Sequence, residues 1–238
     1  MATPRSTLLI ACGALAREIL ALRQAGGWDH LEVDCLPAHY HNTPEAIAPA
    51  VRAKIRENRG RYGRIFVVYG DCGTSGALDR VLAEEGVERM PGPHCYEFYA
   101  GSTAYAAMME AELGTFFLTD YMVRHFDRLI VEGLWLDRHP ELLGQYFGNY
   151  RKLVFLAQTD DAELQEKAAA AATRLGLAYE YRFTGFGGLA DHLREVAAAP
   201  VEASAARPPA TASPAAPPKR NLSLSRRRAR TRRRNVAV

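Results

Sequence analysis

Short apolar runs alternate with amphipathic stretches along most of the 238-residue chain. Short apolar runs bounded by Gly, Pro or polar residues are typical of buried strands, and apolar residues repeated every three or four positions indicate helices. This pattern predicts strands at residues 7–12, 31–35, 64–69, 87–90, 153–157 and 177–182. It predicts helices at residues 14–24, 44–58, 77–85, 99–113, 116–136, 160–175 and 189–199.

The alternation of strands and helices predicts an α/β fold in which helices flank a largely parallel sheet. Residues 1–198 are predicted to form one domain, because a chain of this length can bury a single core. Ligands of such sheets bind in the loops that follow the carboxyl ends of the strands. The loops after the predicted strands are therefore where we expect functional side chains.

The charge of the chain is divided unevenly between a body and a tail. Residues 201–238 contain ten Lys or Arg and one Glu, whereas residues 1–200 carry a net charge of −6. Residues 199–238 are rich in Pro, Ala and Ser, so we predict that they are disordered. The seven Arg between Arg226 and Arg234 are able to contact nucleic acid through phosphate charges alone. We favour a solvated tail, because the body shows no basic groove that would support such binding.

The sequence also bears on the compartment in which the protein works. No apolar run reaches the roughly 18 residues that a membrane-spanning helix needs. The apolar stretch near the N-terminus covers only a few residues, which is too short for the core of a signal peptide. Four cysteines without an export signal are typical of reduced thiols. We therefore expect a cytoplasmic protein without a membrane partner.

Two pairs of cysteines share one spacing. Cys12 and Cys35 are 23 residues apart, and so are Cys72 and Cys95. In each pair the first cysteine ends or closely follows a predicted strand and precedes a glycine and a predicted helix. The equal spacing is either an accident of two similar α/β units or the trace of an internal repeat. A repeat would bring thiols near a pseudo-twofold axis, where they would suit a metal ion or an iron–sulfur cluster.

Thiols and imidazoles in the predicted loops are the candidate metal ligands. The chain has no C-x-x-C pair, so a site must be assembled from distant loops. The donors suit zinc or an iron–sulfur cluster, and the candidates are Cys12, Cys72, Cys95, His39, His41 and His94. Buried inert thiols and ordinary polar loops are the alternative explanation. Cys35 lies inside an apolar strand, and we expect it to be inert.

A glycine-rich loop at residues 70–76 is the candidate catalytic segment. It presents Asp71 and Cys72, and we expect a helix N-terminus to lower the pKa of the Cys72 thiol there. Its spacing matches neither a dinucleotide-binding loop nor a Walker loop. The residues expected to contact a cofactor are the loop glycines Gly70, Gly73 and Gly76 and, after the next strand, Tyr96 and Glu97.

Five short segments together carry a family resemblance. They are residues 11–15 (ACGAL), 69–74 (YGDCGT), 91–98 (PGPHCYEF), 146–150 (YFGNY) and 156–159 (LAQT). Over residues 6–195 the chain resembles an uncharacterised prokaryotic family, domain of unknown function 1638 (DUF1638). Members of that family often accompany corrinoid-dependent methyltransferases and one-carbon enzymes. The resemblance therefore implies a corrinoid-dependent methyltransferase system as partner and a redox, metal or cofactor-maintenance role.

Two functions of different classes fit these observations. The first is an enzyme or accessory protein with a Cys/His site at the strand ends that binds zinc or an iron–sulfur cluster. The second is a metal-free module that binds a small molecule or a partner protein. Metal analysis of protein purified without oxygen separates the two.

Overall fold

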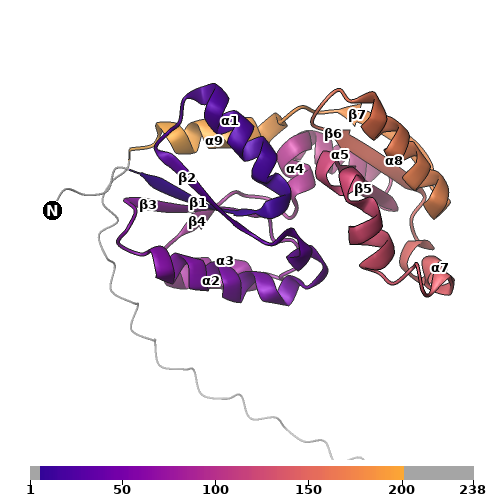
Figure 1. Cartoon of the computed structure of the whole chain (residues 1–238), viewed down its shortest axis with the longest axis horizontal. Helices are drawn as coiled ribbons and strands as arrows, with labels where there is room; N and C mark the ends of the chain where they lie inside the picture. The colour runs from indigo at the N-terminus through magenta and orange to yellow at the C-terminus, as the bar shows by residue number, and fades with distance from the viewer. Residues whose placement is uncertain (1–5, 201–238) are drawn as a thin grey trace, which may run out of the picture.

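The computed structural model describes residues 6–200 and contains two parallel β-sheets, each flanked by helices (Figure 1). The first sheet has the strand order β2-β1-β3-β4, and the second has the order β5-β6-β7. The strands are β1 (Thr7–Cys12), β2 (Leu31–Leu36), β3 (Arg64–Val68), β4 (Glu88–Arg89), β5 (Thr115–Thr119), β6 (Lys152–Ala157) and β7 (Ala178–Phe183). Neighbouring strands are parallel in both sheets, which confirms the predicted α/β class.

The helices occupy the intervals between the strands. The α-helices are α1 (Ala16–Gly26), α2 (Ile47–Asn58), α3 (Ala77–Glu85), α4 (Cys95–Ala100), α5 (Ser102–Ala111), α6 (Asp120–Arg124), α7 (Leu143–Phe147), α8 (Ala162–Leu175) and α9 (Gly187–Ala198). A π-helix covers Asp127–Glu132, and short 3-10 helices cover Gly13–Leu15, Ala38–Asn42, Pro44–Ala46 and Pro140–Leu142. Within residues 6–200, no helix has the length and apolar character needed to cross a membrane.

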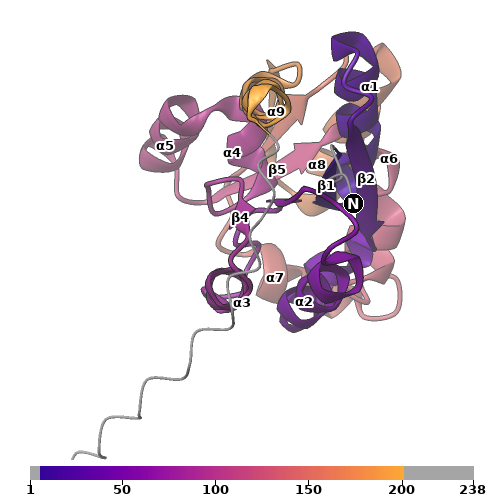
Figure 2. The same ribbon diagram turned by 90° about the vertical axis from the view of Figure 1, so that its left-hand side faces the viewer.

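The first sheet is buried on both faces, which explains the continuous apolar runs of its central strands. Leu9 and Ala11 of β1 belong to one core, which side chains of α1, α4 and α9 complete. Leu8 and Ile10 of the same strand belong to a second core with α2 and α3. In Figures 1 and 2, α1 and α9 accordingly lie on one side of this sheet, and α2 and α3 lie on the other.

The chain leaves the two central strands of the first sheet in opposite directions. β1 leads through α1 to β2 on one side, and β3 leads through α3 to β4 on the other. Because α1 and α3 cover opposite faces, the loops after β1 and β3 diverge, and such a point is where α/β sheets bind ligands. Cys12 is the last residue of β1, so it lies at this point.

The two β-α-β units of the first sheet keep the order and direction that an internal repeat requires. The second unit departs from the first, because β4 has two residues where β2 has six. Cys35 lies within β2 opposite Ala11, whereas Cys95 follows β4 by six residues and begins α4. The shared 23-residue spacing therefore places Cys12 and Cys72 at comparable strand ends, but it does not make Cys35 and Cys95 equivalent.

Two of the predicted helices are wrong in part. The helix predicted at 116–136 begins too early, because Thr115–Thr119 form β5 and pair with β6. Three successive apolar residues at 116–118 suit either a strand or a buried helix, and the pairing decides between them. The helix predicted at 99–113 is two helices, α4 and α5, which meet at Gly101.

Each sheet with the helices packed on it forms one lobe of the molecule. The last helix joins the two lobes. After β7 of the second sheet, α9 crosses back and packs against α1 and α4 of the first lobe (Figure 1). Leu189, Leu193 and Val196 of α9 are buried in the same core as Leu9 of β1 and Ile19 of α1. The core of the first lobe therefore needs both ends of the described chain.

The basic segment at 201–238 lies outside the described residues. Its predicted disorder and the nucleic-acid contacts considered for it stay predictions. The domain boundary after residue 198 stays a prediction as well, although α9 ends at that position.

Candidate functional site

A small cavity lies between the two lobes at the carboxyl ends of β1, β3 and β5. Its volume is about 40 Å³. Its walls are mostly apolar side chains, interrupted by sulfur, hydroxyl and imidazole groups. The side chains that matter below are Cys12, Leu15, His41, Tyr69, Cys72 and Cys95 and, from the second lobe, Thr119, Tyr121, Met122, Leu129 and Ile130.

Three of the four cysteines line this cavity, and three separate segments supply them. Cys12 ends β1, Cys72 lies in the loop after β3, and Cys95 begins α4. A backbone hydrogen bond ties the last two segments together, since the N–H of Cys72 donates to the carbonyl of Pro93 at 2.8 Å. The structure thus brings together the three cysteines that the sequence named as metal ligands, and it leaves Cys35 outside the lining.

The loops that carry Cys72 and Cys95 approach each other closely at Gly70. A Cβ atom at Gly70 would lie 2.9 Å from the backbone nitrogen of His94 and 3.0 Å from the carbonyl carbon of Pro93. Only glycine fits there without moving backbone, so Gly70 permits the two thiols to share the cavity. Gly70 itself is part of the lining.

The three thiols of the cavity are protonated at neutral pH. Burial raises the pKa of Cys12 and Cys95, and it raises the pKa of Cys72 to about 12, with the neighbouring Cys12 thiol adding to that rise. The expectation that a helix N-terminus lowers the pKa of Cys72 is wrong, because α3 begins only at Ala77 and burial dominates. As they stand, these thiols are weak nucleophiles.

Asp71 shapes the glycine-rich loop and is not part of the cavity lining. Its carboxylate accepts hydrogen bonds from Thr74 Oγ1 at 2.7 Å, from the N–H of Gly76 at 2.8 Å and from the N–H of Ser75 at 3.2 Å. Burial alone would raise the pKa of Asp71, but these hydrogen bonds hold it below its ordinary value. Asp71 therefore stabilises the loop as an anion, and a catalytic role for it stays a prediction.

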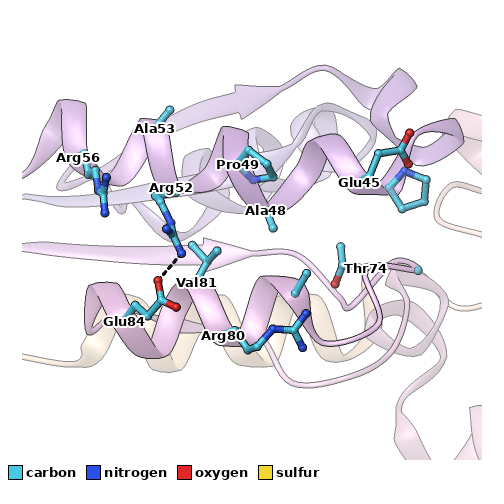
Figure 3. Close-up of a pocket in the computed structure, with 13 residues that line it drawn as sticks. Glu45, Ala48, Pro49, Arg52, Ala53, Arg56, Thr74, Arg80, Val81 and Glu84 are labelled. Carbon is cyan, nitrogen blue, oxygen red and sulfur yellow. Dashed lines mark hydrogen bonds and ion pairs between the residues drawn. The ribbon is translucent and has the colours of Figure 1, made fainter. Parts of the chain in front are cut away.

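Gly73 and Gly76, the other two loop glycines, lie away from the cavity. Gly76 precedes α3, and Gly73 faces Pro44 in a surface groove between α2 and α3. The groove has a volume of about 930 Å³ (Figure 3). Across it, Arg52 forms an ion pair with Glu84, as Figure 3 shows. This arginine is therefore neutralised by a neighbouring acid, and the groove contains none of the candidate thiols.

The three candidate histidines differ in position. His41 lines the cavity, and burial lowers its pKa, so it is a neutral imidazole there. His94 lies close to His41 but behind the lining, with its ring centroid 5.8 Å from that of Tyr96. His39 packs edge-on against Tyr40, with centroids 5.0 Å apart, and is not part of the lining. His41 is thus the candidate imidazole that reaches the cavity.

Tyr96 and Glu97, predicted to contact a cofactor, lie outside the cavity lining. Tyr96 is buried, and its hydroxyl donates to the sulfur of Met122 at 3.5 Å. Glu97 accepts a hydrogen bond from Ser102 Oγ at 2.5 Å, which links α4 to α5. The structure gives both residues packing or bridging contacts, and contact with a cofactor stays a prediction for them.

Tyr69 lines the cavity although the sequence pattern did not single it out. It directly follows β3, is 2% exposed and points its hydroxyl toward the thiols. Burial raises the pKa of Tyr69, and the nearby thiols of Cys12, Cys72 and Cys35 add to the rise. Its position directly after an apolar strand was a signal that could have identified it. The lining residues around Thr119 were hidden because β5 was predicted as a helix.

A network of buried polar groups lies in the second lobe beside the cavity. Asp120 follows the lining residue Thr119, and its carboxylate accepts hydrogen bonds from the N–H of Gln158 at 2.9 Å and from Thr159 Oγ1 at 2.6 Å. The N–H of Asp120 donates in return to Gln158 Oε1 at 2.8 Å. These bonds fix the end of β5 against the end of β6, so they hold one wall of the cavity.

Glu18 of α1 is a buried acid that faces this network from the first lobe. The residue is 7% exposed, and its Oε2 has no hydrogen-bond partner in the described part of the chain. Burial raises the pKa of Glu18, and the carboxylate of Asp120 also raises it, against the opposing effects of Arg17 and Arg124. Glu18 is therefore held in its protonated form to a higher pH than an exposed glutamate.

We expect Glu18→Gln to raise the melting temperature, and by more at about pH 8 than at about pH 5. The proton on Glu18 stabilises the folded state fully below the ordinary pKa of 4.5, and this stabilisation is lost as the pH rises through the raised value. Glutamine resembles the protonated acid and avoids this loss, which is worth about 1 kcal/mol or about 2–4 °C.

Thermal melts of wild type and variant across pH check this expectation. Glu163→Gln on the exposed face of α8 is the control: it removes only an exposed ion pair with Lys167, so its melting temperature should change little and by the same amount at about pH 5 and about pH 8. A shift that is the same at both pH values would show that Glu18 is not the titrating group.

Between residues 6 and 200, no group of three or more His, Cys, Asp or Glu side chains is arranged to hold a metal ion. The cavity therefore offers thiols and an imidazole, but these do not form a compact ligand set for a single ion. The prediction of a zinc or iron–sulfur site therefore gains no support from this arrangement.

The comparisons with known proteins identify one family. The family described as "Protein of unknown function (DUF1638)" matches residues 35–193. This range contains Cys72 and Cys95, and Cys12 precedes it. Comparisons with curated proteins and with solved structures gave no match. Because the match covers well over half of the sequence, the chain belongs to the DUF1638 family.

Proposed function

We propose that the protein binds an iron–sulfur cluster in the cavity between its lobes, with Cys12, Cys72 and Cys95 as the ligands. The observation that carries the proposal is that three thiols from three separate segments line one small cavity. Thiolates are the usual ligands of such clusters, and a cluster can join distant segments because each thiolate binds a different iron.

A cluster makes different demands on ligand spacing than a single ion does. A single zinc ion, with bonds to sulfur of about 2.3 Å, would need thiolates about 3.5–4 Å apart. Residues 6–200 contain no such compact group of three ligands. Thiolates on one cluster lie about 6–7 Å apart, so a looser arrangement around a cavity suits them. His41 is the imidazole of the lining and is the candidate for a fourth ligand.

The surroundings of the thiols also suit a cluster. Leu15, Met122 and Ile130 contribute apolar surface to the lining, and such a shell limits access of water to a metal centre. The thiols are neutral without a ligand, so ligation requires them to release protons. Because the thiols are neutral, the ligand-free protein buries all three at a small cost in free energy.

A metal-free function is the second candidate, and the same cavity supports it. The lining is mostly apolar and its thiols are protonated, which suits a small apolar molecule held without coordination bonds. The corrinoid-dependent methyltransferase system as a partner, a role in one-carbon metabolism and the cytoplasmic location stay predictions, because they rest on the resemblance and the composition.

Purification without oxygen tests the proposal. We expect the wild type to be brown and to contain iron and acid-labile sulfide, directly or after reconstitution with iron and sulfide. Cys72→Ser should lose most of the iron, because a serine hydroxyl stays protonated at neutral pH and does not replace a thiolate. Cys35→Ser is the matched control and should keep the wild-type content, since Cys35 is not part of the lining.

Two results would overturn the cluster. The first is a colourless wild type that takes up no iron on reconstitution, and the metal-free function then becomes the better explanation. The second is equal iron content in the Cys72→Ser and Cys35→Ser variants, which would place any bound iron elsewhere.

A further inference from the structure

Strand β7 leaves one of its two edges unpaired. It is the last strand of the second sheet, and within residues 6–200 it pairs only with β6 (Figure 1). The N–H of Ala178 donates to the carbonyl of Arg151 at 3.1 Å, so the even-numbered residues of β7 direct their backbone groups toward β6. The odd-numbered residues Tyr179, Tyr181 and Phe183 direct theirs outward, where the described part of the chain offers them no hydrogen bond. Such a free edge is a template for another strand.

The edge of β7 also lacks the features that normally protect an exposed strand. Proteins protect such edges with proline, a bulge, a short strand or charged side chains. In the first sheet, β4 has only two residues, and β2 carries the acids Glu32 and Asp34 and no base. β7 has six residues, pairs with β6 without interruption, contains no proline or lysine, and carries two charges of opposite sign. Two of its aromatic side chains face solvent, since Phe183 is 59% exposed and Tyr179 is 37% exposed.

The sequence of β7, AYEYRF, is complementary to itself in the antiparallel direction. When Tyr181 lies on a twofold axis, Glu180 of one copy is opposite Arg182 of the other, and Tyr179 is opposite Phe183. Opposite charges and aromatic pairs are side-chain combinations that stabilise neighbouring strands. The outward backbone groups of the odd-numbered residues also face one another in this register, so their hydrogen bonds are completed.

A shift of the register would lose this match. The outward backbone groups meet again only after a shift of two residues, because neighbouring residues point in opposite directions. Such a shift places Glu180 opposite its own copy or Arg182 opposite its own copy, and like charges directly opposite destabilise a pair of strands. In the single chain Arg182 already pairs with Glu180 of its own strand, so both side chains lie on one face and are in place to meet a second copy. The charges therefore select one register.

We propose that the protein forms a dimer in which the β7 strands of two copies pair antiparallel about a twofold axis at Tyr181. The pairing joins the two copies of the three-stranded sheet into one continuous sheet. Contact between identical surfaces is the usual geometry of a twofold dimer. The interface is small, so we expect a reversible dimer that forms at about 10–100 μM. The inference does not depend on the proposed function, because β7 contributes no residue to the cavity lining.

Sedimentation of the full chain over a range of concentrations tests the dimer. We expect the wild type to change from monomer to dimer as its concentration rises through about 10–100 μM. Arg182→Glu should raise the dissociation constant about tenfold or more, because it places two acids opposite each other at two symmetric positions. Arg194→Glu makes the same charge change on the exposed face of α9, so it is the matched control and should dimerise like the wild type.

A mixture of two charge variants tests the register. Glu180→Arg and Arg182→Glu should each dimerise weakly alone, because like charges then face each other across the axis. When the two variants are mixed, each arginine of one chain lies opposite a glutamate of the other, and we expect a heterodimer with about the wild-type dissociation constant. Damage to the fold of either variant could not produce this rescue.

Three results would overturn the inference. A wild type that stays monomeric at about 300 μM would show that the edge of β7 does not pair with a second copy. Wild-type dimerisation of Arg182→Glu would place the interface on another surface. A mixture of the two charge variants that forms no heterodimer would exclude the register that the charges select.

Discussion

Replacing Asp120 by alanine is expected to lower the free energy of unfolding by about 3–5 kcal/mol, or the melting temperature by about 10 °C. Asp120 is 2% exposed and accepts hydrogen bonds from the N–H of Gln158 and from both the N–H and the hydroxyl of Thr159. Alanine leaves these donors without a partner, and buried unpaired donors cost more than the net value of the bonds they lose.

The Asp120→Ala replacement should also disturb the candidate site. The network around Asp120 holds the end of β5 against β6, and Thr119, the last residue of β5, lines the cavity. We therefore expect Asp120→Ala to weaken ligand retention as well as stability, whereas a change on the far surface should affect neither.

Denaturant unfolding monitored by circular dichroism measures the expected loss. Asp191→Ala is the control, because within residues 6–200 Asp191 pairs only with exposed Arg194 of α9, and such surface pairs contribute about 0–1 kcal/mol. If Asp120→Ala and Asp191→Ala lost the same small amount of stability, the network would not be the anchor of β5 that its geometry indicates.

The sequence was sufficient to predict the strands of the first lobe and part of the site. Apolar runs such as residues 7–12 and 64–69 predicted buried parallel strands, because few other structures bury consecutive apolar residues in so short a segment. Cys12 is the last residue of the first run and Cys72 lies three residues after the second, and the ends of parallel strands meet at one edge of a sheet. Their approach was therefore predictable from order alone, without any distance information.

The second lobe was harder to predict for physical reasons. Residues 115–119 contain two phenylalanines and a leucine in succession and continue directly into α6, so no Gly or Pro separates strand from helix. Whether such a run is strand or helix depends on whether another strand pairs with it, and here β6, more than thirty residues later, provides the pairing. The pairing of β5 with β6 joins segments far apart in the sequence, so the hydrophobic pattern within residues 115–119 cannot predict it.

The partition into two lobes depends on the last helix. Its apolar spacing predicted a helix near the end of the body, but not the surface that it covers. Leu189, Leu193 and Val196 could have packed on the second sheet, which immediately precedes them in the chain. They pack on the first sheet instead, because the core there, between α1 and α4, is incomplete without them.

Gly187, the first residue of α9, makes this arrangement testable. A Cβ atom at Gly187 would lie 1.8 Å from the carbonyl oxygen of Tyr99 in α4, and φ at this position is +44°. The backbone of α9 thus lies directly on the backbone of α4, and the left-handed conformation adds strain for any residue with a side chain. The atoms nearest to such a Cβ all belong to the backbone of Tyr99, so no flexible side chain could move aside.

We expect Gly187→Ala to lower the free energy of unfolding by about 3 kcal/mol or more, because α9 must shift and expose part of its buried apolar face. Gly144→Ala is the control: a Cβ there meets nothing within 4 Å, and Gly144 lies inside α7, where alanine favours the helix. Chemical unfolding of both variants measures the difference, and limited proteolysis should cut Gly187→Ala first between β7 and α9. Equal stability of the two variants would mean that α9 tolerates displacement, and it would then not be the element that holds the lobes, and the cavity between them, in place.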